Sequence, residues 1–244
     1  MAEASDGGAV VLVTGGVRGL GLATARRLTA RGDRVHVTHR SSDDLARELQ
    51  AELPGRVHRS DALSAPDSEA LVARILEREG RLDHVVHAVG EYVTGPLEEL
   101  DPEDFQRMLR SNAESAFLIA RSARAALRAA RGSLVCFACA GLEGLRARRD
   151  MAAYAAAKSA LVVLARSLAV EEAPHGVRVN VVSPGHVPHA HASPDTRDPE
   201  LWKRIPMGRP GTPEEIADAV AWLTSRAARY VTGTNLEIAG GWML

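Results

Sequence analysis

The segment from Val10 to Gly21, VVLVTGGVRGLG, constrains the fold of this 244-residue chain more than any other. Its first four residues are aliphatic, which is typical of a strand buried on both faces. Glycines then interrupt the pattern, and helical spacing resumes from Leu22 to Leu28. A glycine turn between a strand and a helix lets the backbone approach a pyrophosphate, whose charge the helix N-terminus favours. The sequence therefore predicts a dinucleotide-binding turn at its start.

Strands and helices are expected to alternate along the whole chain. The expected strands are 10–13, 34–38, 56–60, 84–88, 133–139, 178–182 and 235–239. The expected helices are 22–28, 43–53, 66–79, 102–130, 151–172 and 213–224, with a short helix at 199–204 inside an irregular segment, 186–210. Such alternation predicts a parallel sheet with helices on both faces. We expect an α/β protein with one doubly wound Rossmann domain over residues 1–244 and a seven-stranded parallel sheet.

Composition excludes several classes of function. Hydrophobic residues make up 45% and charged residues 25%, and the net charge of -1 gives no basic surface for nucleic acid or an anionic membrane. No run approaches the ~18 apolar residues of a membrane span, and the start lacks a secretory pattern, so we expect a cytoplasmic protein. Cys136 and Cys139 are three residues apart on an expected strand, which favours buried thiols over a redox or metal pair.

The end of the second expected strand indicates which dinucleotide is bound. Ligands of such sheets bind beyond the carboxyl ends of the strands. An acid about twenty residues after the glycine turn would hold the ribose of NAD, whereas arginine suits the 2′-phosphate of NADP. Arg40 stands at this strand end, and Arg18 lies inside the glycine turn, which favours NADP(H). In the alternative, Arg40 is solvated and Asp43 or Asp44 reaches the ribose.

Two further strand ends carry polar side chains. Asp61, which ends the third strand, either accepts a hydrogen bond from the adenine amino group or forms a turn. The fourth strand exits through small residues, Ala88 to Gly90, which leave room for a cofactor beside the backbone. His87 just before them is expected to be a hydrogen-bonded structural residue rather than a catalyst.

Tyr154 and Lys158 form the candidate catalytic pair. Positions i and i+4 of a helix share one face, so the phenol and the ammonium are expected to lie side by side. A nearby cation favours the phenolate and lowers the pKa of a tyrosine, which makes Tyr154 a usable general acid near neutral pH. The pattern Y-x-x-x-K is common by itself, but here it accompanies the glycine turn and the Ser183-Pro184-Gly185 strand exit.

With these residues in place, the chain from Val10 onward resembles a classical short-chain dehydrogenase/reductase, most closely the ketoacyl-carrier-protein-reductase-like subgroup. The resemblance implies that Tyr154 and Lys158 are catalytic and also contact the cofactor, and that Asn112 holds a water beside the lysine. It also implies cofactor contacts at the pyrophosphate, adenine, ribose and nicotinamide: Gly15, Gly19, Gly21, Asp61, Ala88, Gly90, Pro184, Gly185 and Val187. The expected cofactor site also includes Arg18 and Arg40, argued above, and Leu20 and Ala62.

The chain departs from the family pattern at two places. The family has a serine after the fifth strand that holds the substrate carbonyl oxygen, but no serine or threonine occurs from Leu134 to Lys158. Aligned strand ends place Cys139 there, with Ala138 and Gly141 as the other candidates, and a thiol is only a weak donor. The second departure is the turn His87-Ala88-Val89-Gly90, where the family often has two asparagines, an alanine and a glycine.

The segment 186–210 is expected to form a lid over the substrate, as the resemblance implies. Its histidines, His186, His189 and His191, are expected to be solvated or to face the substrate, and a metal site is the weaker alternative. Pocket candidates are Glu91, Tyr92, Leu142, Glu143, Met151 and Trp202. The outer faces of the helical stretches 105–127 and 151–168 are rich in alanine and apolar residues, which favours a homodimer or homotetramer.

Three functional hypotheses follow. The first is an NADPH-dependent oxidoreductase that reduces a ketone of a small molecule, either free or carrier-bound, with Tyr154 as proton donor and Cys139 at the weakened substrate-polarising position. The second is a pteridine- or quinone-type reductase, because relatives that lack the serine reduce such groups. The third is an NADP-binding subunit or sensor with little activity. No metal is expected in any of them.

Overall fold

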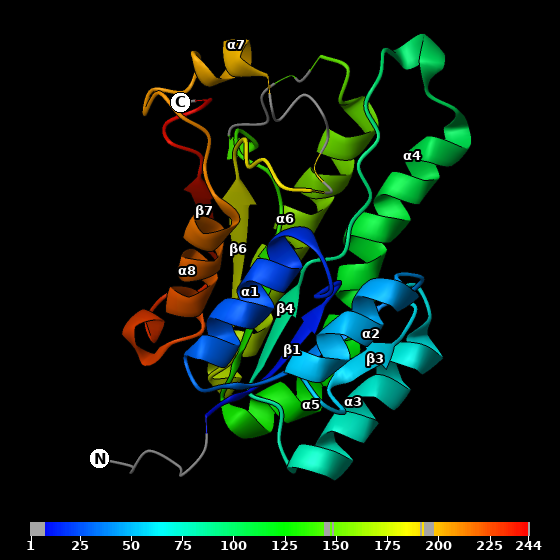
Figure 1. Ribbon diagram of the computed structural model, residues 1–244, viewed down its shortest axis with the longest axis vertical. Coiled ribbons are helices and arrows are strands. Elements are labelled where there is room, and N and C mark those ends of the chain that lie inside the picture. The colour runs from blue at the N-terminus through cyan, green and yellow to red at the C-terminus, as the bar shows by residue number, and fades with distance from the viewer. Residues whose placement is uncertain (1–7, 144–146, 148, 191, 193–197, 244) are drawn as a thin grey trace.

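One parallel sheet of seven strands forms the centre of the protein, in the order β3-β2-β1-β4-β5-β6-β7 (Figure 1). The computed structural model describes residues 8–143, 147, 149–190, 192 and 198–243. The strands are β1 (Val10–Thr14), β2 (Arg34–His39), β3 (Val57–Arg59), β4 (His84–His87), β5 (Ser133–Phe137), β6 (Arg178–Pro184) and β7 (Asn235–Ile238). This order confirms the predicted doubly wound α/β sheet: all strands run parallel, and the order in which successive strands are added reverses between β1 and β4.

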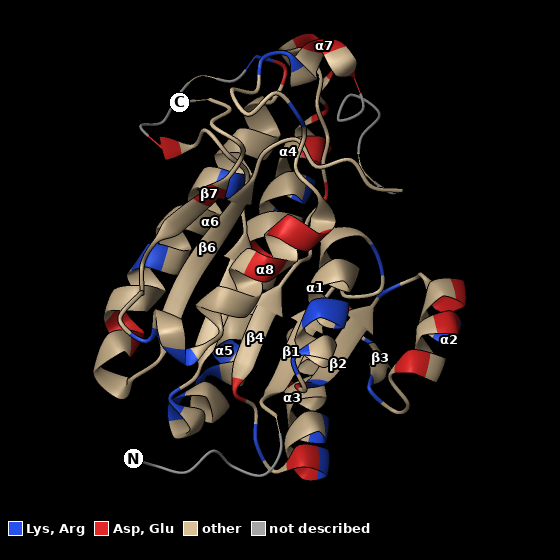
Figure 2. Cartoon of the chain, turned by 60° about the vertical axis from the view of Figure 1, so that its left-hand side comes forward, with Lys and Arg blue, Asp and Glu red and all other residues tan. Residues whose placement is uncertain are grey.

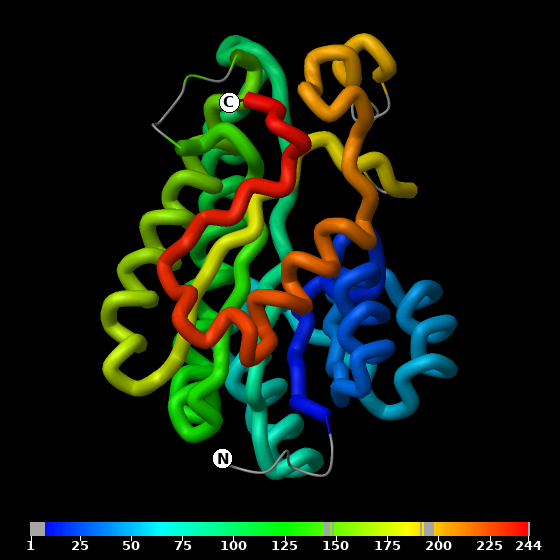
Figure 3. The backbone as a smooth tube through the Cα atoms, turned by 90° about the vertical axis from the view of Figure 1, so that its left-hand side faces the viewer, coloured from blue at the N-terminus to red at the C-terminus, as the bar shows by residue number. Residues whose placement is uncertain are grey.

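Helices cover both faces of this sheet. Residues of α1 (Gly19–Ala30), α2 (Asp43–Glu52) and α8 (Pro213–Leu223) share one apolar core, while α3 (Ala65–Glu79), α5 (Ser115–Ala130) and α6 (Ala152–Glu172) share another. Figure 3 views the sheet from its β7 edge, with α1 and α8 on one side and α6 on the other. Helix α8 begins at a capping box, in which Thr212 Oγ1 accepts the amide of Glu215 and the Glu215 side chain accepts the amide of Thr212.

Several boundaries differ from the sequence prediction. The stretch 102–130 is not one regular helix: α4 (Pro102–Leu109) and α5 are joined by a π-helical turn, Arg110–Glu114. In that turn the Asn112 side chain donates to Met108 O at 3.0 Å, and Ser115 Oγ donates to Ser111 O at 2.7 Å. Side-chain donors that bond carbonyls of the preceding turn compete with the regular helical ladder. The turn keeps Asn112 fully buried.

Two other differences concern the exits of strands. β5 ends at Phe137, so Cys139 belongs to the following loop rather than to the strand, whereas β6 continues to Pro184. The short helix in the segment after β6 is α7 (Pro199–Trp202), which ends two residues before the predicted boundary at Arg204. A short 3₁₀ turn, Leu97–Glu99, was not predicted.

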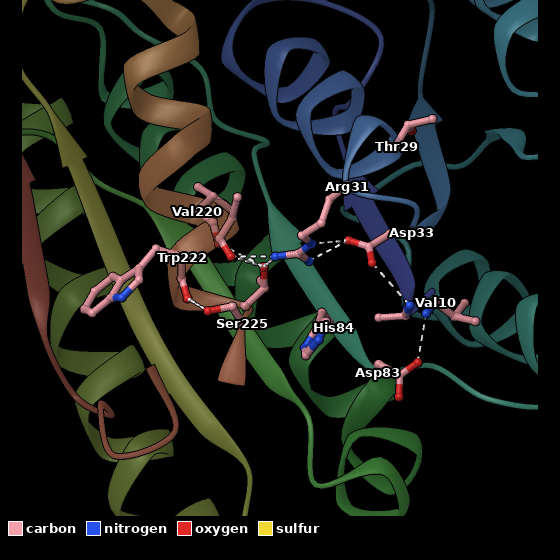
Figure 4. A network of polar contacts seen from close by, with 12 residues as sticks. Val10, Thr29, Arg31, Asp33, Asp83, His84, Val220, Trp222 and Ser225 are labelled. Carbon is pink, nitrogen blue, oxygen red and sulfur yellow. Dashed lines mark hydrogen bonds and ion pairs between the residues drawn. The ribbon is translucent and has the colours of Figure 1, made fainter. Parts of the chain in front are cut away.

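A polar network ties the start of β1 to α1 and α8 at the amino ends of the strands (Figure 4). Arg31 donates to Asp33 Oδ2 at 2.8 Å and to Thr224 Oγ1 at 3.0 Å. The other Asp33 oxygen accepts the amide of Ala9 at 3.2 Å, and Asp83 Oδ2 accepts the amide of Val10 at 2.8 Å. Because these carboxylates are hydrogen-bonded and nearly buried, the network anchors the first strand at this end of the sheet.

The distribution of surface charge indicates which kinds of partner the protein can bind. Charges of both signs are spread over the helices and loops of the view in Figure 2 rather than gathered into a patch of one sign.

By length and composition alone, Ala152–His175 could cross a membrane, which the sequence analysis did not recognise. Leu161, Ala165 and Ala169 of this segment are buried in the core beneath the sheet. Its apolar composition is therefore that of a core helix.

Candidate active site

A cavity of about 470 Å³ lies at the carboxyl ends of the strands. It is bounded by the glycine turn, the exits of the strands, the first turns of α6 and the segment after β6. The structure brings together here nearly all the residues singled out from the sequence: Gly15, Arg18, Gly19, Leu20, Gly21, Arg40, Ala62, Ala88, Gly90, Cys139, Tyr154, Lys158, Pro184, Gly185 and Val187. Asp61 and Asn112 lie outside the lining.

The glycine turn is packed too closely for larger residues. A Cβ on Gly21 would lie 2.4 Å from Gly15 O, and one on Gly15 would lie 2.9 Å from Ala88 O. Gly15 also has φ +70°, and its amide donates to Thr38 Oγ1 at 3.1 Å. Helix α1 starts at Gly19 with no acidic residue in its first turn and no side-chain cap. This end of the cavity therefore fits a pyrophosphate, which the open helix N-terminus would favour.

The exit of β2 carries hydrogen-bond donors into the cavity. Arg40, Ser41 and Ser42 line it together with Arg18. Arg40 Nη2 lies 3.8 Å from Glu91, a loose contact between two partly exposed side chains. Neither acid of the alternative interpretation lines the cavity; Asp43 lies 3.5 Å from His39 Nδ1, and Asp44 pairs with Arg47. These side chains are hydrogen-bond donors of the kind that bind a phosphate.

Asp61 has the local role of a turn residue. Its Oδ1 accepts the amide of Leu63 at 3.0 Å, and its own amide donates to Asp67 Oδ2 at 3.0 Å. Its neighbours Ser60, Ala62 and Leu63 line the cavity, whereas Asp61 does not. Asp61 thus forms an Asx turn through its Oδ1, and a contact of its carboxylate with adenine stays a prediction.

Lys158 is held rigidly beneath the cavity. Its Nζ donates to Phe137 O at 2.7 Å, at the end of β5, and the residue is 5% exposed. Burial lowers the pKa of Lys158 to about 8, so its ammonium is still the main form at neutral pH. The Nζ lies 5.7 Å from the centre of the Tyr154 ring, which places the cation beside the phenol as the helical spacing predicts.

Asn112 supplies a buried acceptor behind the lysine. Its Nδ2 donates to Glu91 O at 3.1 Å and to Met108 O at 3.0 Å, while its Oδ1 is buried without a hydrogen-bond partner. A Cβ on Gly90 would lie 2.2 Å from this oxygen and 3.2 Å from Lys158 Nζ. The Asn112 amide oxygen and the Lys158 ammonium therefore both lie next to the side of Gly90 where any other residue would carry its Cβ. An acceptor buried in this way suits a small polar molecule such as water.

Tyr154 faces the cavity between aromatic and apolar neighbours. The ring of Tyr92 meets the Tyr154 ring edge-on, with centroids 4.8 Å apart, and Met151 lines the same wall. Of the predicted pocket residues, Glu91, Tyr92 and Met151 line the cavity. Leu142, Glu143 and Trp202 do not; Glu143, for example, pairs with Arg166 at 2.8 Å. Trp242 lines it from beyond β7, where no sequence pattern indicated a site residue.

The two cysteines have different environments. Cys136 on β5 is 2% exposed, and burial raises the pKa of its thiol to about 12. Cys139 is only half-buried and lines the cavity beyond the end of β5. The prediction of buried thiols therefore holds for Cys136 alone. Of the other candidates for the serine position, Ala138 also lines the cavity, and the Gly141 amide donates to Glu237 Oε1 at 2.7 Å.

His87 is a structural residue, as predicted. Ser115 Oγ donates to Ser111 O, so it accepts from His87 Nε2 at 2.9 Å, and His87 Nδ1 accepts from Thr14 Oγ1 at 2.8 Å. Burial lowers the pKa of His87 to about 3, which keeps the ring neutral. The histidine links β1 and β4 to the helix that follows the π-helical turn.

The histidines after β6 occupy two places in the cavity. His186 packs edge-on against Trp242, with ring centroids 4.4 Å apart, and His189 lies against the glycine turn. His191 lies outside the described residues. In the described part of the chain, no group of three histidine, cysteine, aspartate or glutamate side chains is arranged to hold a metal ion.

This fold and this site together define a nicotinamide-dependent oxidoreductase. The family model described as enoyl-(acyl carrier protein) reductase matches residues 15–243. The chain belongs to the short-chain dehydrogenase/reductase family. L-Fucose dehydrogenase from Oryctolagus cuniculus is 34% identical over 96% of this chain and 84% of its own length.

Solved structures of the family are similar over nearly their whole length. A short-chain dehydrogenase/reductase from Serratia marcescens is 32% identical, with a TM-score of 0.88 over 98% of this chain and 99% of that one. A blue fluorescent protein from a metagenomic library, solved in complex with NADPH, is 30% identical, with a TM-score of 0.89 and the same coverage. These comparisons confirm the resemblance stated from the glycine turn and the tyrosine–lysine pair.

Proposed function

We propose that this protein is an NADP(H)-dependent oxidoreductase that interconverts a ketone and a secondary alcohol of a small molecule. The observation that carries the proposal is the position of Lys158, buried against Phe137 O and beside the Tyr154 ring, in a cavity whose other end presents Arg18 and Arg40. A proton donor at one end and donors for a phosphate at the other are what a nicotinamide-dependent carbonyl reduction requires.

The residues of the chain divide the chemistry among them. A bound nicotinamide dinucleotide would exchange a hydride with the carbonyl carbon. Tyr154 gives its proton to the carbonyl oxygen, and the ammonium of Lys158 stabilises the phenolate that remains. The buried Oδ1 of Asn112 holds a water that returns the proton. Cys139 contributes a weak hydrogen bond to the substrate oxygen.

Replacement of Arg40 by alanine is expected to weaken NADPH binding by about tenfold to a hundredfold, because a charge-assisted hydrogen bond to the 2′-phosphate is lost. NADH binding should change by less than twofold. Titration of nicotinamide fluorescence measures both affinities. Arg47→Ala is the matched control, since Arg47 is an exposed arginine of α2 that pairs with Asp44 outside the cavity.

Other outcomes of this titration have definite meanings. An equal effect of Arg40→Ala on both dinucleotides, or a preference of the wild type for NADH, would contradict the role of Arg40 and favour Asp43 or Asp44 at the ribose. If the wild type bound neither dinucleotide, the oxidoreductase proposal itself would be wrong.

Replacement of Cys139 by serine tests the substrate. A hydroxyl donates a stronger hydrogen bond than a thiol, and a missing donor to the developing oxyanion typically costs about 10²–10³ in rate. We therefore expect kcat/KM for simple ketones to rise at least about tenfold in Cys139→Ser. Cys136→Ala, which removes the other thiol at a buried site, should leave kcat/KM unchanged.

The opposite result would favour a second function. A loss of activity with Cys139→Ser on a pteridine- or quinone-type substrate would indicate a site built around the thiol. The third hypothesis, a binding subunit with little activity, is less well supported, because such a protein has no need for a buried lysine beside a cavity-facing tyrosine.

We further propose that the protein acts in the cytoplasm as a homodimer or homotetramer. The outer faces of α4, α5 and α6 present partly exposed apolar side chains, among them Phe105, Phe117, Val163 and Val170. Such side chains on neighbouring helices are suited to pairing across a two-fold axis.

A further inference from the structure

One carboxylate stands beside the donors of the cavity. Among the described residues that line the cavity, Glu91 is the only acidic one. Its Oε1 lies 3.8 Å from Nη2 of Arg40, the residue that follows β2, and its Oε2 lies 2.9 Å from Nε of Arg107 on α4. The Glu91 carboxylate is therefore placed between two guanidinium groups that come from separate elements of the fold.

The two guanidinium groups differ in position and in the closeness of their contact. Arg40 lines the cavity, and its 3.8 Å separation from Glu91 is longer than a hydrogen bond. Arg107 does not line the cavity, but its 2.9 Å contact with Glu91 is at hydrogen-bond distance. The carboxylate is thus held closely from outside the cavity and touches Arg40 only loosely within it.

The backbone of Glu91 is fixed on both sides of its side chain. Its amide donates to Ser111 Oγ at 3.3 Å, and its carbonyl accepts from Asn112 Nδ2 at 3.1 Å. Ser111 is 3% exposed and Asn112 is fully buried, so both partners are themselves held in the core. The Glu91 side chain, in contrast, is 37% exposed. The carboxylate can therefore move by side-chain rotation while the backbone stays where it is.

A carboxylate at this place opposes the binding of a phosphate by Arg40. An ionised carboxylate accepts hydrogen bonds and donates none, so it cannot bond a phosphate oxygen. It also repels the negative charge of a phosphate, and it uses the same guanidinium donors that a phosphate needs. A phosphate bound to Arg40 must therefore take the place of Glu91 at that guanidinium.

From this arrangement we propose that Glu91 competes with the 2′-phosphate of NADP(H) for Arg40, and that Arg107 holds the carboxylate when the phosphate binds. This inference rests on the proposed function, because it assumes that Arg40 binds the 2′-phosphate. The phosphate displaces the loose contact at Arg40, while the closer contact with Arg107 is kept. Discrimination between NADPH and NADH then depends on three residues: Arg40 binds the phosphate, Glu91 opposes it, and Arg107 weakens that opposition.

The test is a cycle of substitutions at Glu91 and Arg107. Glu91→Gln removes the charge and keeps the size of the side chain, so we expect NADPH to bind about fivefold more tightly, the effect of a partly exposed charge pair. NADH has no 2′-phosphate, and its affinity should stay within twofold. Arg107→Ala leaves the carboxylate to Arg40 alone, so it should weaken NADPH binding about fivefold. Titration of nicotinamide fluorescence measures each affinity without turnover.

The double variant shows whether Arg107 acts through Glu91. In the Glu91→Gln background, Arg107→Ala should change NADPH affinity by less than twofold, because no carboxylate remains to be held. Glu52→Gln and Arg26→Ala are the matched controls, since this ion pair of 2.7 Å joins α2 and α1 outside the cavity lining. Neither control should change the affinity for NADPH or NADH.

Three results would overturn the inference. The first is unchanged or weaker NADPH binding in Glu91→Gln. The second is weaker NADH binding in the same variant, which would mean that the carboxylate bonds the ribose. The third is an equal effect of Arg107→Ala with and without Glu91→Gln, which would mean that Arg107 acts on the phosphate itself.

Failure of this inference is distinguishable from failure of the proposed function. If Arg40→Ala weakened NADPH binding while Glu91→Gln did not strengthen it, only the competition by Glu91 would be wrong. If the wild type bound neither NADPH nor NADH, the proposed function would be wrong, and the inference would fail with it.

Discussion

Replacement of Tyr154 by phenylalanine is expected to lower kcat by about 10²–10⁴, the range that a positioned general acid contributes. The variant removes only the hydroxyl, so the edge-on contact with the Tyr92 ring and the position of Lys158 beside the ring are kept. NADPH binding should therefore stay within about twofold of the wild type. Single-turnover reduction of a panel of aliphatic, cyclic and aromatic ketones, together with a fluorescence titration, measures the two quantities separately.

Tyr230→Phe is the matched control, because Tyr230 is fully exposed and remote from the cavity. The control should behave as the wild type does. A Tyr154→Phe variant that retained more than a tenth of the wild-type rate would contradict the assignment, since the proton would then come from another group. A variant that lost NADPH binding as well would leave the fall in rate unexplained by proton transfer alone.

The protein is expected to unfold in mild acid, between about pH 6 and pH 4. Burial lowers the pKa of His58 and His84 from 6.5 to about 4 and that of His87 to about 3, and it also lowers the pKa of His36. These rings are neutral when folded and take up protons only on unfolding. The stabilisation that these neutral histidines give is complete above pH 6.5, the pKa of histidine in the unfolded chain. It is lost as the pH falls towards 4.

The size of this effect is large compared with ordinary domain stability. A shift from 6.5 to about 4 corresponds to on the order of 3 kcal/mol for one buried histidine. Several such groups together approach the 5–15 kcal/mol that stabilises a typical domain. Urea unfolding at pH 7, 6 and 5 should show a free energy of unfolding that falls by about 1.4 kcal/mol per pH unit for each proton taken up.

Single substitutions show which histidine takes up each proton when the protein unfolds. His58 Nε2 bonds His36 Nδ1 at 2.9 Å inside the sheet, and His58→Gln keeps a donor at that point without a titrating ring. The pH slope of this variant should decrease by about one proton, whereas His175→Gln, on the surface, should leave the slope unchanged. A wild-type stability that stayed constant from pH 7 to pH 5 would contradict the assignment of neutral buried histidines.

The architecture was predictable because its local signals agree with one another. The aliphatic run of β1, the glycine turn and the capping box at Thr212 each specify one local structure, and the alternation of strands and helices predicts the parallel sheet, though not its strand order. The tyrosine–lysine pair was predictable for the same reason, since helical periodicity places residues four apart on one face. Strand and helix ends were predicted to within a few residues.

Other features depend on contacts between segments far apart in the sequence. The π-helical turn was not predicted, because the spacing of residues does not show that the Asn112 side chain donates to the Met108 carbonyl. Trp242, which no sequence pattern indicated, reaches the cavity because the segment after β7 lies beside the exit of β6. Asp61 stands at the right strand end for an adenine contact, and one of its carboxylate oxygens accepts the amide of Leu63, a contact that its position in the sequence does not reveal.

The polar network of Arg31, Asp33 and Asp83 lies at the end of the sheet away from the candidate active site, around the amides of Ala9 and Val10. The two ends of the sheet therefore have separate roles: one carries the candidate active site, and the other holds the first strand in place. The loops at the cavity can be exchanged to accept new substrates while this network continues to clamp the first strand. A retargeting library should therefore randomise only the cavity end and leave Arg31, Asp33 and Asp83 untouched.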